Sequence, residues 1–257
     1  MKKTLSATLG LALALAFGTA TIAPPLAADG LVIPQVSVLK GEKNFLSGYE
    51  PINLDGTINA VVEIPAGTLA KYEVDKDTGM MAIEQKNGKP RYVQYLGYPA
   101  NYGMVPRTLL PKSKGGDGDP LDVFILGPSV PSGTVVKARA IGSIILLDAG
   151  EIDDKLILVM EDGPFANVSS LSDMEKRFPG ALGILQTWLT HYKGYDKNGK
   201  LVLSSPGFNG RAATIKTIGD AVLDYYKEHV TDADRRPLDE KGNPYLYRWP
   251  GSKNVAE

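Results

Sequence analysis

The chain has 257 residues, with 28 basic side chains against 29 acidic ones and a net charge of −1 at pH 7. A charge so close to zero argues against partners that are selected by charge alone, such as nucleic acids and anionic membranes. The absence of cysteine excludes disulfide bonds, so the fold must depend on its hydrophobic core. The length suits one substantial domain or two small ones.

The N-terminus has the pattern of a secretory signal peptide. Two lysines follow the initial methionine, the run Leu9–Phe17 is apolar, and small residues continue to Ala28. A charged start, a short apolar centre and a small-residue exit are typical of such leaders, and the apolar run is too short to cross a bilayer. We therefore expect residues 1–28 to be a signal peptide, cleaved after either Ala20 or Ala28, and the protein to be periplasmic or secreted.

Short predicted strands dominate the chain up to residue 160. Residues 29–55, with scattered glycine, proline and polar residues, are predicted to form an N-terminal extension. Turn-forming residues such as Asn87-Gly88 then separate short apolar or alternating runs. The predicted strands are Ala60–Ile64, Lys71–Val74, Met80–Glu84, Arg91–Leu96, Leu121–Leu126, Val135–Ala140, Ser143–Leu147 and Leu156–Met160. Many short strands at this spacing indicate an antiparallel barrel or sandwich.

Helical periodicity replaces the strand pattern in the last third of the chain. The tetrapeptide that begins at Ser172 fits a capping box and predicts a short helix. Two longer helices are predicted over Ala181–Tyr192 and Arg211–His229. Their apolar stripes are Leu185, Trp188, Leu189 and Tyr192 in one, and Ile215, Ile218, Val222 and Tyr225 in the other. Strands followed by helices predict an α+β domain over residues 56–230, and residues 231–257 are predicted to be a C-terminal extension.

The segment Gly115–Val123 carries three carboxylates, on Asp117, Asp119 and Asp122. Asp117 and Asp119 point the same way in an extended segment, which Pro120 favours. Clustered carboxylates repel one another unless they are solvated or neutralised by cations, and oxygen ligands beside an apolar strand suit Mg²⁺. An acidic turn that only leads into a strand is the alternative interpretation. An EF-hand is excluded because Asp122 stands where that loop requires glycine.

Other charged and aromatic residues extend this pattern. Glu63 lies within an otherwise apolar strand, and Lys71 and Glu73 share one face of the next strand because they are two residues apart. A third group, at the junction of two strongly apolar strands, consists of Asp148, Asp153 and Lys155. Each charge alone is more often a solvated surface group, but together they have the composition of a site where metals meet a polyanion. Tyr98 and Tyr102 flank a turn, where edge packing of aromatic rings would also explain them.

In these residues the chain closely resembles the family I soluble inorganic pyrophosphatases, over residues 55–228. The matching pieces occur in the family's order: Val62-Glu63-Ile64-Pro65, Lys71-Tyr72-Glu73, Arg91, Gly97-Tyr98, Asn101-Tyr102-Gly103, Asp117-Gly118-Asp119-Pro120-Leu121-Asp122-Val123, Asp148, Asp153, Lys155 and Tyr192-Lys193. The Asp-x-Asp-Pro-x-Asp element is the family's signature. The resemblance implies an OB-like antiparallel five-stranded β-barrel with flanking helices, in agreement with the α+β prediction. Together with the leader pattern, it predicts an exported bacterial member of the family.

The resemblance also implies how the chain binds metal. Asp117, Asp122 and Asp153 would hold the tighter ion, while Glu73 and Asp148 would help to hold the ions that arrive with substrate. The expected cofactor is Mg²⁺, with Mn²⁺ as the alternative, because oxygen ligands alone do not distinguish the two.

Catalytic and substrate-binding roles follow from the same resemblance. Asp119 would orient or deprotonate the attacking water, and Tyr98 and Lys155 complete the catalytic set. Phosphate oxygens would be contacted by Lys71, Arg91, Lys155, Tyr192 and Lys193, with Tyr102 in a supporting position. Glu63 would line the same cavity.

The implied activity is Mg²⁺-dependent hydrolysis of inorganic pyrophosphate to two orthophosphates by a metal-activated water, without a covalent intermediate. A homo-oligomer, either hexamer or dimer, is expected. Two positions depart from or strain the family pattern: Ala149 stands where an acid is expected, and Gln85 competes with Arg91 in a shorter alignment. They leave open a protein that binds metal or polyphosphate without turnover. A broader hydrolase of polyphosphate or nucleotides is the third alternative.

Overall fold

The computed structural model describes residues 38–148 and 151–229. The predicted signal peptide, the predicted C-terminal extension and Ala149 lie outside these ranges. The strands are β1 (Val38–Leu39), β2 (Ile58–Ile64), β3 (Tyr72–Val74), β4 (Met81–Ile83), β5 (Gln85–Lys86), β6 (Lys89–Pro90), β7 (Asn101–Met104), β8 (Asp122–Leu126), β9 (Val135–Asp148), β10 (Glu151–Ile152), β11 (Lys155–Met160) and β12 (Leu203–Gly210). The helices are α1 (Leu171–Arg177), α2 (Ala181–His191) and α3 (Arg211–His229), with a short 3-10 helix at Lys112–Lys114.

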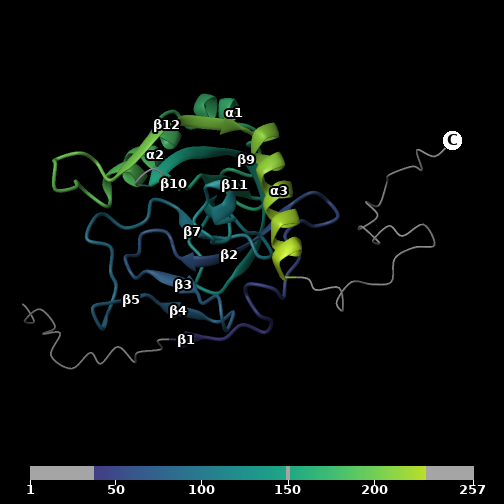
Figure 1. Cartoon of the computed structure of the whole chain (residues 1–257). Coiled ribbons are helices and arrows are strands. Elements are labelled where there is room, and N and C mark those ends of the chain that lie inside the picture. Colours follow the sequence, from purple (N-terminus) through teal and green to yellow (C-terminus); the bar gives the residue numbers. More distant parts are fainter. Residues whose placement is uncertain (1–37, 149–150, 230–257) are drawn as a thin grey trace, which may run out of the picture. The chain divides into compact units, whose positions relative to one another are not determined.

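The fold is a mixed α+β arrangement around one seven-stranded sheet (Figure 1). Its strand order is β10-β9-β11-β8-β7-β2, with β12 also paired to β9, and β9 pairs in addition with β2. Strands β2, β7, β8, β11 and β9 therefore form a closed circuit of pairings. A separate three-stranded sheet has the order β1-β4-β3, and β5 and β6 form a two-stranded hairpin.

The sequence predicted a purely antiparallel pairing, but one pair of strands in the sheet is parallel. Strands β8 and β11 run parallel, with Leu156 opposite Val123. The reason lies in β9, which follows β8 and is antiparallel to β11. Two reversals of the chain direction therefore leave β8 and β11 pointing the same way, so the first residues of both strands lie at the same end of the strand pair.

Three predicted elements differ from the observed ones. Val135–Ala140 and Ser143–Leu147 belong to the single strand β9, which is continuous through Gly142. Arg91–Leu96 forms no strand apart from one isolated bridge. Strand β12 was not predicted, because its proline and two glycines have low strand propensity.

The three helices lie close to where they are predicted. The N-cap of α1 is Ser170 rather than Ser172, since the Ser170 hydroxyl accepts a hydrogen bond from the Asp173 amide at 3.1 Å. On α2, the predicted residues Leu185, Trp188 and Leu189 are buried. On α3, Ile218 and Tyr225 are buried as predicted, whereas Ile215 is exposed and the buried stripe runs through Thr214 and Ala221 instead.

Strands β8 and β11 are buried on both faces. Alternate residues of β8 belong to different apolar clusters: Phe124 packs with residues of α1 and α2, and Val123 packs with residues of α3. The same alternation holds in β11 for Ile157 and Leu156. Burial on both faces explains why these strands are continuous apolar runs in the sequence. The charged residues Asp122 and Lys155 are the first residues of β8 and β11, where the two buried runs begin.

Strands β2 and β7 approach so closely that only glycine fits at residue 103. A Cβ atom on Gly103 would lie 1.8 Å from the carbonyl oxygen of Val61. We expect Gly103→Ala to lower the free energy of unfolding by about 2–3 kcal/mol, measured by urea denaturation. The matched control is Gly183→Ala on α2, where a Cβ atom meets none of the described residues within 4 Å and helix propensity predicts a gain of up to about 1 kcal/mol. Equal effects of the two substitutions would contradict this account.

Within the described ranges, no helix combines the length and the apolar character that a membrane crossing requires.

Candidate active site

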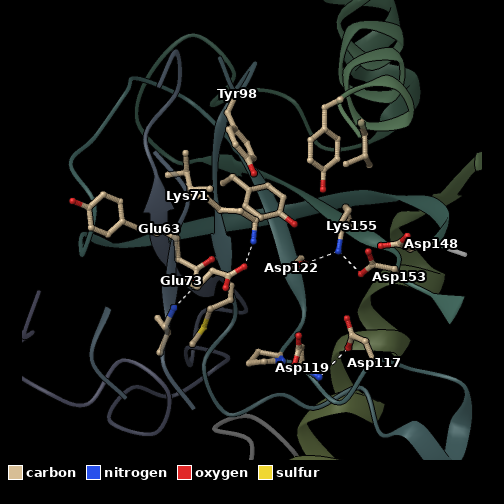
Figure 2. Close-up of a pocket in the computed structure, with 18 of the residues that line it drawn as sticks. Glu63, Lys71, Glu73, Tyr98, Asp117, Asp119, Asp122, Asp148, Asp153 and Lys155 are labelled. Carbon is tan, nitrogen blue, oxygen red and sulfur yellow. Dashed lines mark hydrogen bonds and ion pairs between the residues drawn. The ribbon is translucent and has the colours of Figure 1, made fainter. Parts of the chain in front are cut away.

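One pocket collects every residue that the sequence predicts for the site (Figure 2). Its volume is about 240 Å³, and it lies where several strands begin or end. The predicted residues that line it are Glu63, Lys71, Glu73, Arg91, Tyr98, Tyr102, Asp117, Asp119, Asp122, Asp148, Asp153, Lys155, Tyr192 and Lys193. These residues are up to 130 positions apart, so their convergence is a product of the fold.

The parallel pairing of β8 and β11 creates the centre of this pocket. Asp122 and Lys155 are the first residues of the two strands and lie side by side because Val123 pairs with Leu156. The Lys155 ammonium donates a hydrogen bond to Asp122 Oδ2 at 2.5 Å and another to Asp153. Burial lowers the pKa of Lys155, but the two carboxylates outweigh it and raise that pKa above its ordinary value. Lys155 therefore remains a cation although it is only 4% exposed.

Crowding and burial disfavour the ionised carboxylates of this pocket. Burial, opposed by Lys155 and reinforced by Asp122, raises the pKa of Asp153 to about 6. Burial is also the main cause that raises the pKa of Asp117. In such a site, bound cations relieve the repulsion among the acids.

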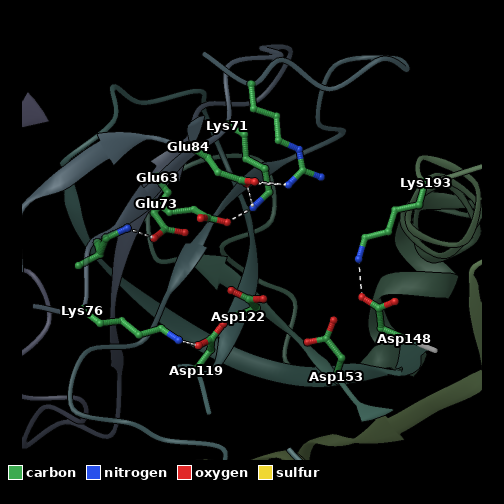
Figure 3. Close-up of polar contacts among 12 residues, drawn as sticks. Glu63, Lys71, Glu73, Lys76, Glu84, Asp119, Asp122, Asp148, Asp153 and Lys193 are labelled. Carbon is green, nitrogen blue, oxygen red and sulfur yellow. Dashed lines mark hydrogen bonds and ion pairs between the residues drawn. The ribbon is translucent and has the colours of Figure 1, made fainter. Parts of the chain in front are cut away.

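Asp117 and Asp119 lie in one tight turn. The Asp119 amide donates a hydrogen bond to Asp117 Oδ1 at 2.9 Å, and Gly118 between them has φ of 86°. Asp119 forms an ion pair with Lys76, a pocket residue that was not predicted (Figure 3). Lys76 follows β3 in a turn that is 43 residues away in the sequence, and no local pattern links it to the aspartates.

Glu84 links two of the predicted phosphate-binding cations (Figure 3). Arg91 Nη1 donates to both carboxylate oxygens of Glu84, at 2.7 and 2.6 Å, and Lys71 Nζ lies 3.0 Å from the same carboxylate. Lys71 also forms an ion pair with Glu73. Burial raises the pKa of Glu84, but Arg91 and Lys71 outweigh it, so the pKa lies below its ordinary value.

The sequence contains a signal for the position of Glu84. The β5–β6 hairpin pairs Lys86 with Lys89 and Gln85 with Pro90 around its turn. Counting one step further outward places Glu84 opposite Arg91, and the Arg91 amide indeed donates to the Glu84 carbonyl at 2.8 Å. The hairpin also bears on the alternative at Gln85, because Arg91 lines the pocket and Gln85 does not.

Aromatic rings form one wall of the pocket. Tyr98 lies between Trp188 and Tyr102, with ring centroids 4.4 and 5.1 Å away, and Trp188 stacks on Tyr192 at 4.7 Å. Burial is the main cause that raises the pKa of all three tyrosines. Their hydroxyls are therefore neutral and can donate hydrogen bonds to an anion. The rings also pack with the main core, so the packing role and the pocket role coexist.

The remaining wall carries Asp148 at the end of β9, which forms an ion pair with Lys193 (Figure 3). The two histidines, His191 and His229, do not line the pocket. His191 Nδ1 lies 2.8 Å from the Thr187 carbonyl, and His229 stacks on Tyr225.

Comparison with known proteins identifies the family of the chain that carries this pocket. The sequence model of the inorganic pyrophosphatases matches residues 60–226. The chain belongs to the family I inorganic pyrophosphatases. It is 36% identical over 187 residues to soluble inorganic pyrophosphatase 2 of Chlamydomonas reinhardtii, a match that covers 71% of this chain and 88% of that protein.

Two further relatives agree in family and fold. The mitochondrial inorganic pyrophosphatase of Saccharomyces cerevisiae is 33% identical over 180 residues, covering 62% of this chain and 58% of the yeast protein. The crystal structure of type I inorganic pyrophosphatase from P falciparum superposes with a TM-score of 0.65 at 27% identity, covering 72% of this chain and 63% of that one. This chain therefore spans little more than half the length of the yeast pyrophosphatase.

The donor set of this pocket fits a hard divalent cation in chemistry. All candidate ligands are carboxylates, which suit Mg²⁺. Asp122 and Asp153 already converge on one cationic atom, the Lys155 ammonium nitrogen. Among residues 38–148 and 151–229, however, no three acidic or histidine side chains lie close enough together to surround one ion. Asp119, Asp148 and Glu73 contact lysines instead.

Glu63 carries the largest carboxylate pKa shift in the pocket. It is 6% exposed, accepts a hydrogen bond from the Val74 amide at 2.7 Å, and has a pKa raised from 4.5 to about 8 by burial and then by the charge of Asp122. The folded protein thus holds a proton that the unfolded chain releases between these pH values. The resulting stabilisation is present at low pH and is lost as the pH rises toward 8.

We expect Glu63→Gln to flatten the dependence of stability on pH. Urea denaturation between pH 5 and pH 8 should show a wild-type free energy of unfolding that falls by at most about 1.4 kcal/mol per pH unit from this group. Glutamine imitates the protonated acid and removes that contribution. Exposed Glu161 provides the control substitution Glu161→Gln. A wild-type slope retained in Glu63→Gln would show that Glu63 does not hold this proton.

Proposed function

We propose that this chain hydrolyses inorganic pyrophosphate to two orthophosphates, with Mg²⁺ as cofactor. One observation carries the proposal: all the residues that the family resemblance assigns to catalysis, substrate binding and metal binding line a single pocket in a chain that belongs to the inorganic pyrophosphatases.

Family I pyrophosphatases depend on metal ions. In this chain Asp117, Asp122 and Asp153 would hold the tighter ion, and Glu73 and Asp148 would help to hold the others. When bound, a divalent cation supplies a water of lowered pKa and neutralises charge on the phosphates. The all-oxygen donor set supports Mg²⁺, with Mn²⁺ as the substitute.

The chain's own residues supply the rest of the chemistry. Asp119 would accept the proton of the attacking water, and its carboxylate forms an ion pair with Lys76. The main electrostatic demand is to offset the charge on the departing phosphate, for which the pocket offers fixed cations. These are Lys71, Arg91, Lys155 and Lys193, and the neutral hydroxyl donors are Tyr98, Tyr102 and Tyr192.

A phosphate-release assay tests this function. Purified protein should release orthophosphate from pyrophosphate in the presence of Mg²⁺, and a chelator should abolish the release. Binding of pyrophosphate without release would instead identify a sequestering protein that retains the fold. Tripolyphosphate and ATP as alternative substrates separate a narrow enzyme from a broad hydrolase.

Finer features of the sequence prediction also remain proposals. The closed circuit of β2, β7, β8, β11 and β9 supports an OB-like five-stranded barrel. We assign residues 29–55 to an N-terminal extension, 56–230 to the catalytic domain and 231–257 to a C-terminal extension. In the first of these, β1 pairs with β4, and Phe45 is buried.

The leader pattern in residues 1–28 supports an exported bacterial enzyme that acts in a periplasm or outside the cell. The family resemblance supports a homo-oligomer. Cell fractionation tests the location, and full-length protein recovered from the cytosol with its leader would contradict it. Gel filtration of the mature protein tests the oligomer.

A further inference from the structure

A second cavity, which we call the basic groove, adjoins the candidate active site. Arg91, Tyr192 and Lys193 line both cavities, so the two adjoin at these residues. The other lining residues come from residues 86–94 and Val202. Among the described residues that line the basic groove, all the charged ones are cations, whereas seven carboxylates as well as cations line the active-site pocket. An anion could therefore bind in the groove without a bridging metal ion.

The β5–β6 hairpin holds two of these cations, Lys86 and Lys89, close enough together to repel each other. Its turn residues Asn87 and Gly88 have φ of 55° and 71°, the left-handed values of a type I′ hairpin turn. The register sets Lys86 directly opposite Lys89, and like charges in that position destabilise a strand pair. In the 38–148 and 151–229 ranges neither lysine has an ion-pair partner. An anionic ligand would supply the missing counter-charge.

The two cations shared with the active site differ from this pair. Arg91 is held by Glu84, and Lys193 contacts Asp148. The net positive charge of the groove is therefore concentrated on Lys86 and Lys89, next to a pocket whose proposed ligand is a diphosphate.

We propose that the basic groove binds the outer phosphates of a linear oligophosphate whose terminal diphosphate occupies the active-site pocket. This inference rests on the proposed function. Arg91 and Lys193 lie at the junction, so one continuous phosphate chain would contact cations from the active site through to the hairpin. Tripolyphosphate is the shortest ligand that reaches beyond a diphosphate, and pyrophosphate is too short to need the groove.

The test compares how tightly tripolyphosphate and pyrophosphate bind to the full chain. In the double variant Lys86→Gln/Lys89→Gln, we expect the inhibition constant of tripolyphosphate against pyrophosphate hydrolysis to rise roughly fivefold at low ionic strength, and the KM for pyrophosphate to change less. The difference should shrink with added salt because the lysines are exposed. The matched control, Lys137→Gln/Lys176→Gln, removes the same charge from exposed positions outside both cavities and should leave both constants unchanged.

Failure of this inference differs from failure of the proposed function. If the wild-type chain released no phosphate, the proposed function would be wrong. Titration calorimetry with tripolyphosphate would still test the binding of oligophosphate in the basic groove, because the double variant should then bind tripolyphosphate more weakly than the wild type. A tripolyphosphate affinity or inhibition constant that is unchanged in the double variant would overturn the proposal that the groove binds oligophosphate. Equal rises in the tripolyphosphate and pyrophosphate constants overturn it as well.

The same assay with ATP distinguishes the two sources of a phosphate chain, an inorganic oligophosphate and a nucleotide. A rise for tripolyphosphate, with or without one for ATP, supports the proposal, since the hairpin then contacts phosphates. A rise for ATP alone overturns the assignment to an inorganic chain.

Discussion

Asp119→Asn is expected to lower kcat for pyrophosphate by on the order of 100-fold or more, the usual effect of losing a general base. Asparagine cannot accept the proton of the attacking water, yet it preserves the shape of the turn, because the Asp119 backbone amide, and not its side chain, bonds to Asp117. Steady-state phosphate release over a range of Mg²⁺ concentrations measures the effect. The concentration of Mg²⁺ that gives half-maximal rate should stay near the wild-type value.

Asp122→Asn provides the contrasting variant. It removes charge from a proposed metal ligand that lies beside Lys155, so it should raise the Mg²⁺ concentration required for activity. If Asp119→Asn retained full turnover at saturating Mg²⁺, Asp119 would not be the proton acceptor. If the two variants responded to Mg²⁺ identically, the division into a base and a metal ligand would be wrong.

Lys155→Met is expected to lower the free energy of unfolding by about 3–5 kcal/mol at pH 7, the usual cost of breaking a buried ion pair on one side. Methionine fills similar space but leaves Asp122 and Asp153 without the cation that both contact. Burial already raises the pKa of Asp153, and loss of the opposing Lys155 cation raises it further above its ordinary value. The variant should therefore recover stability as the pH is lowered, because Asp153 takes up a proton.

Urea denaturation of both proteins at pH 5 and pH 7 measures this effect. Lys216→Met is the matched control, since the ammonium of Lys216 forms an ion pair with Asp220 on the exposed face of α3 and surface ion pairs contribute little. A loss in Lys155→Met as small as that of the control would mean that the central ion pairs are solvated. A loss that did not change between the two pH values would exclude repulsion between the carboxylates as its cause.

Residue chemistry was easier to predict than residue pairing. The apolar runs that become β8 and β11 identify Asp122 and Lys155 as strand-end charges, but strand patterns carry no direction. An antiparallel pairing would have separated these two residues by the length of the strands. Their contact depends on the parallel register, which arises from two chain reversals around β9. The sequence therefore predicts side chains that line one pocket but not how the centre of that pocket is assembled.

Residues that act at long range escaped prediction for a similar reason. Lys76 reaches Asp119 across a distance in sequence that no periodicity spans. Glu84 was within reach, because the Asn87-Gly88 turn fixes the register that brings it to Arg91. Strand β12 was missed because its pairing with β9 overrides a composition rich in proline and glycine.

Strand β9 pairs with β2, β10, β11 and β12, and this has a consequence for how the molecule opens. Amide protons of β9 should exchange with deuterated solvent only when the entire domain unravels, whereas those of the small β1-β4-β3 sheet can exchange through local opening. Asp148 is attached to the former and Glu73 to the latter. The side of the active-site pocket that carries Asp148 is thus attached to the slowest-exchanging part of the protein. The side that carries Glu73 can open locally while β9 stays folded.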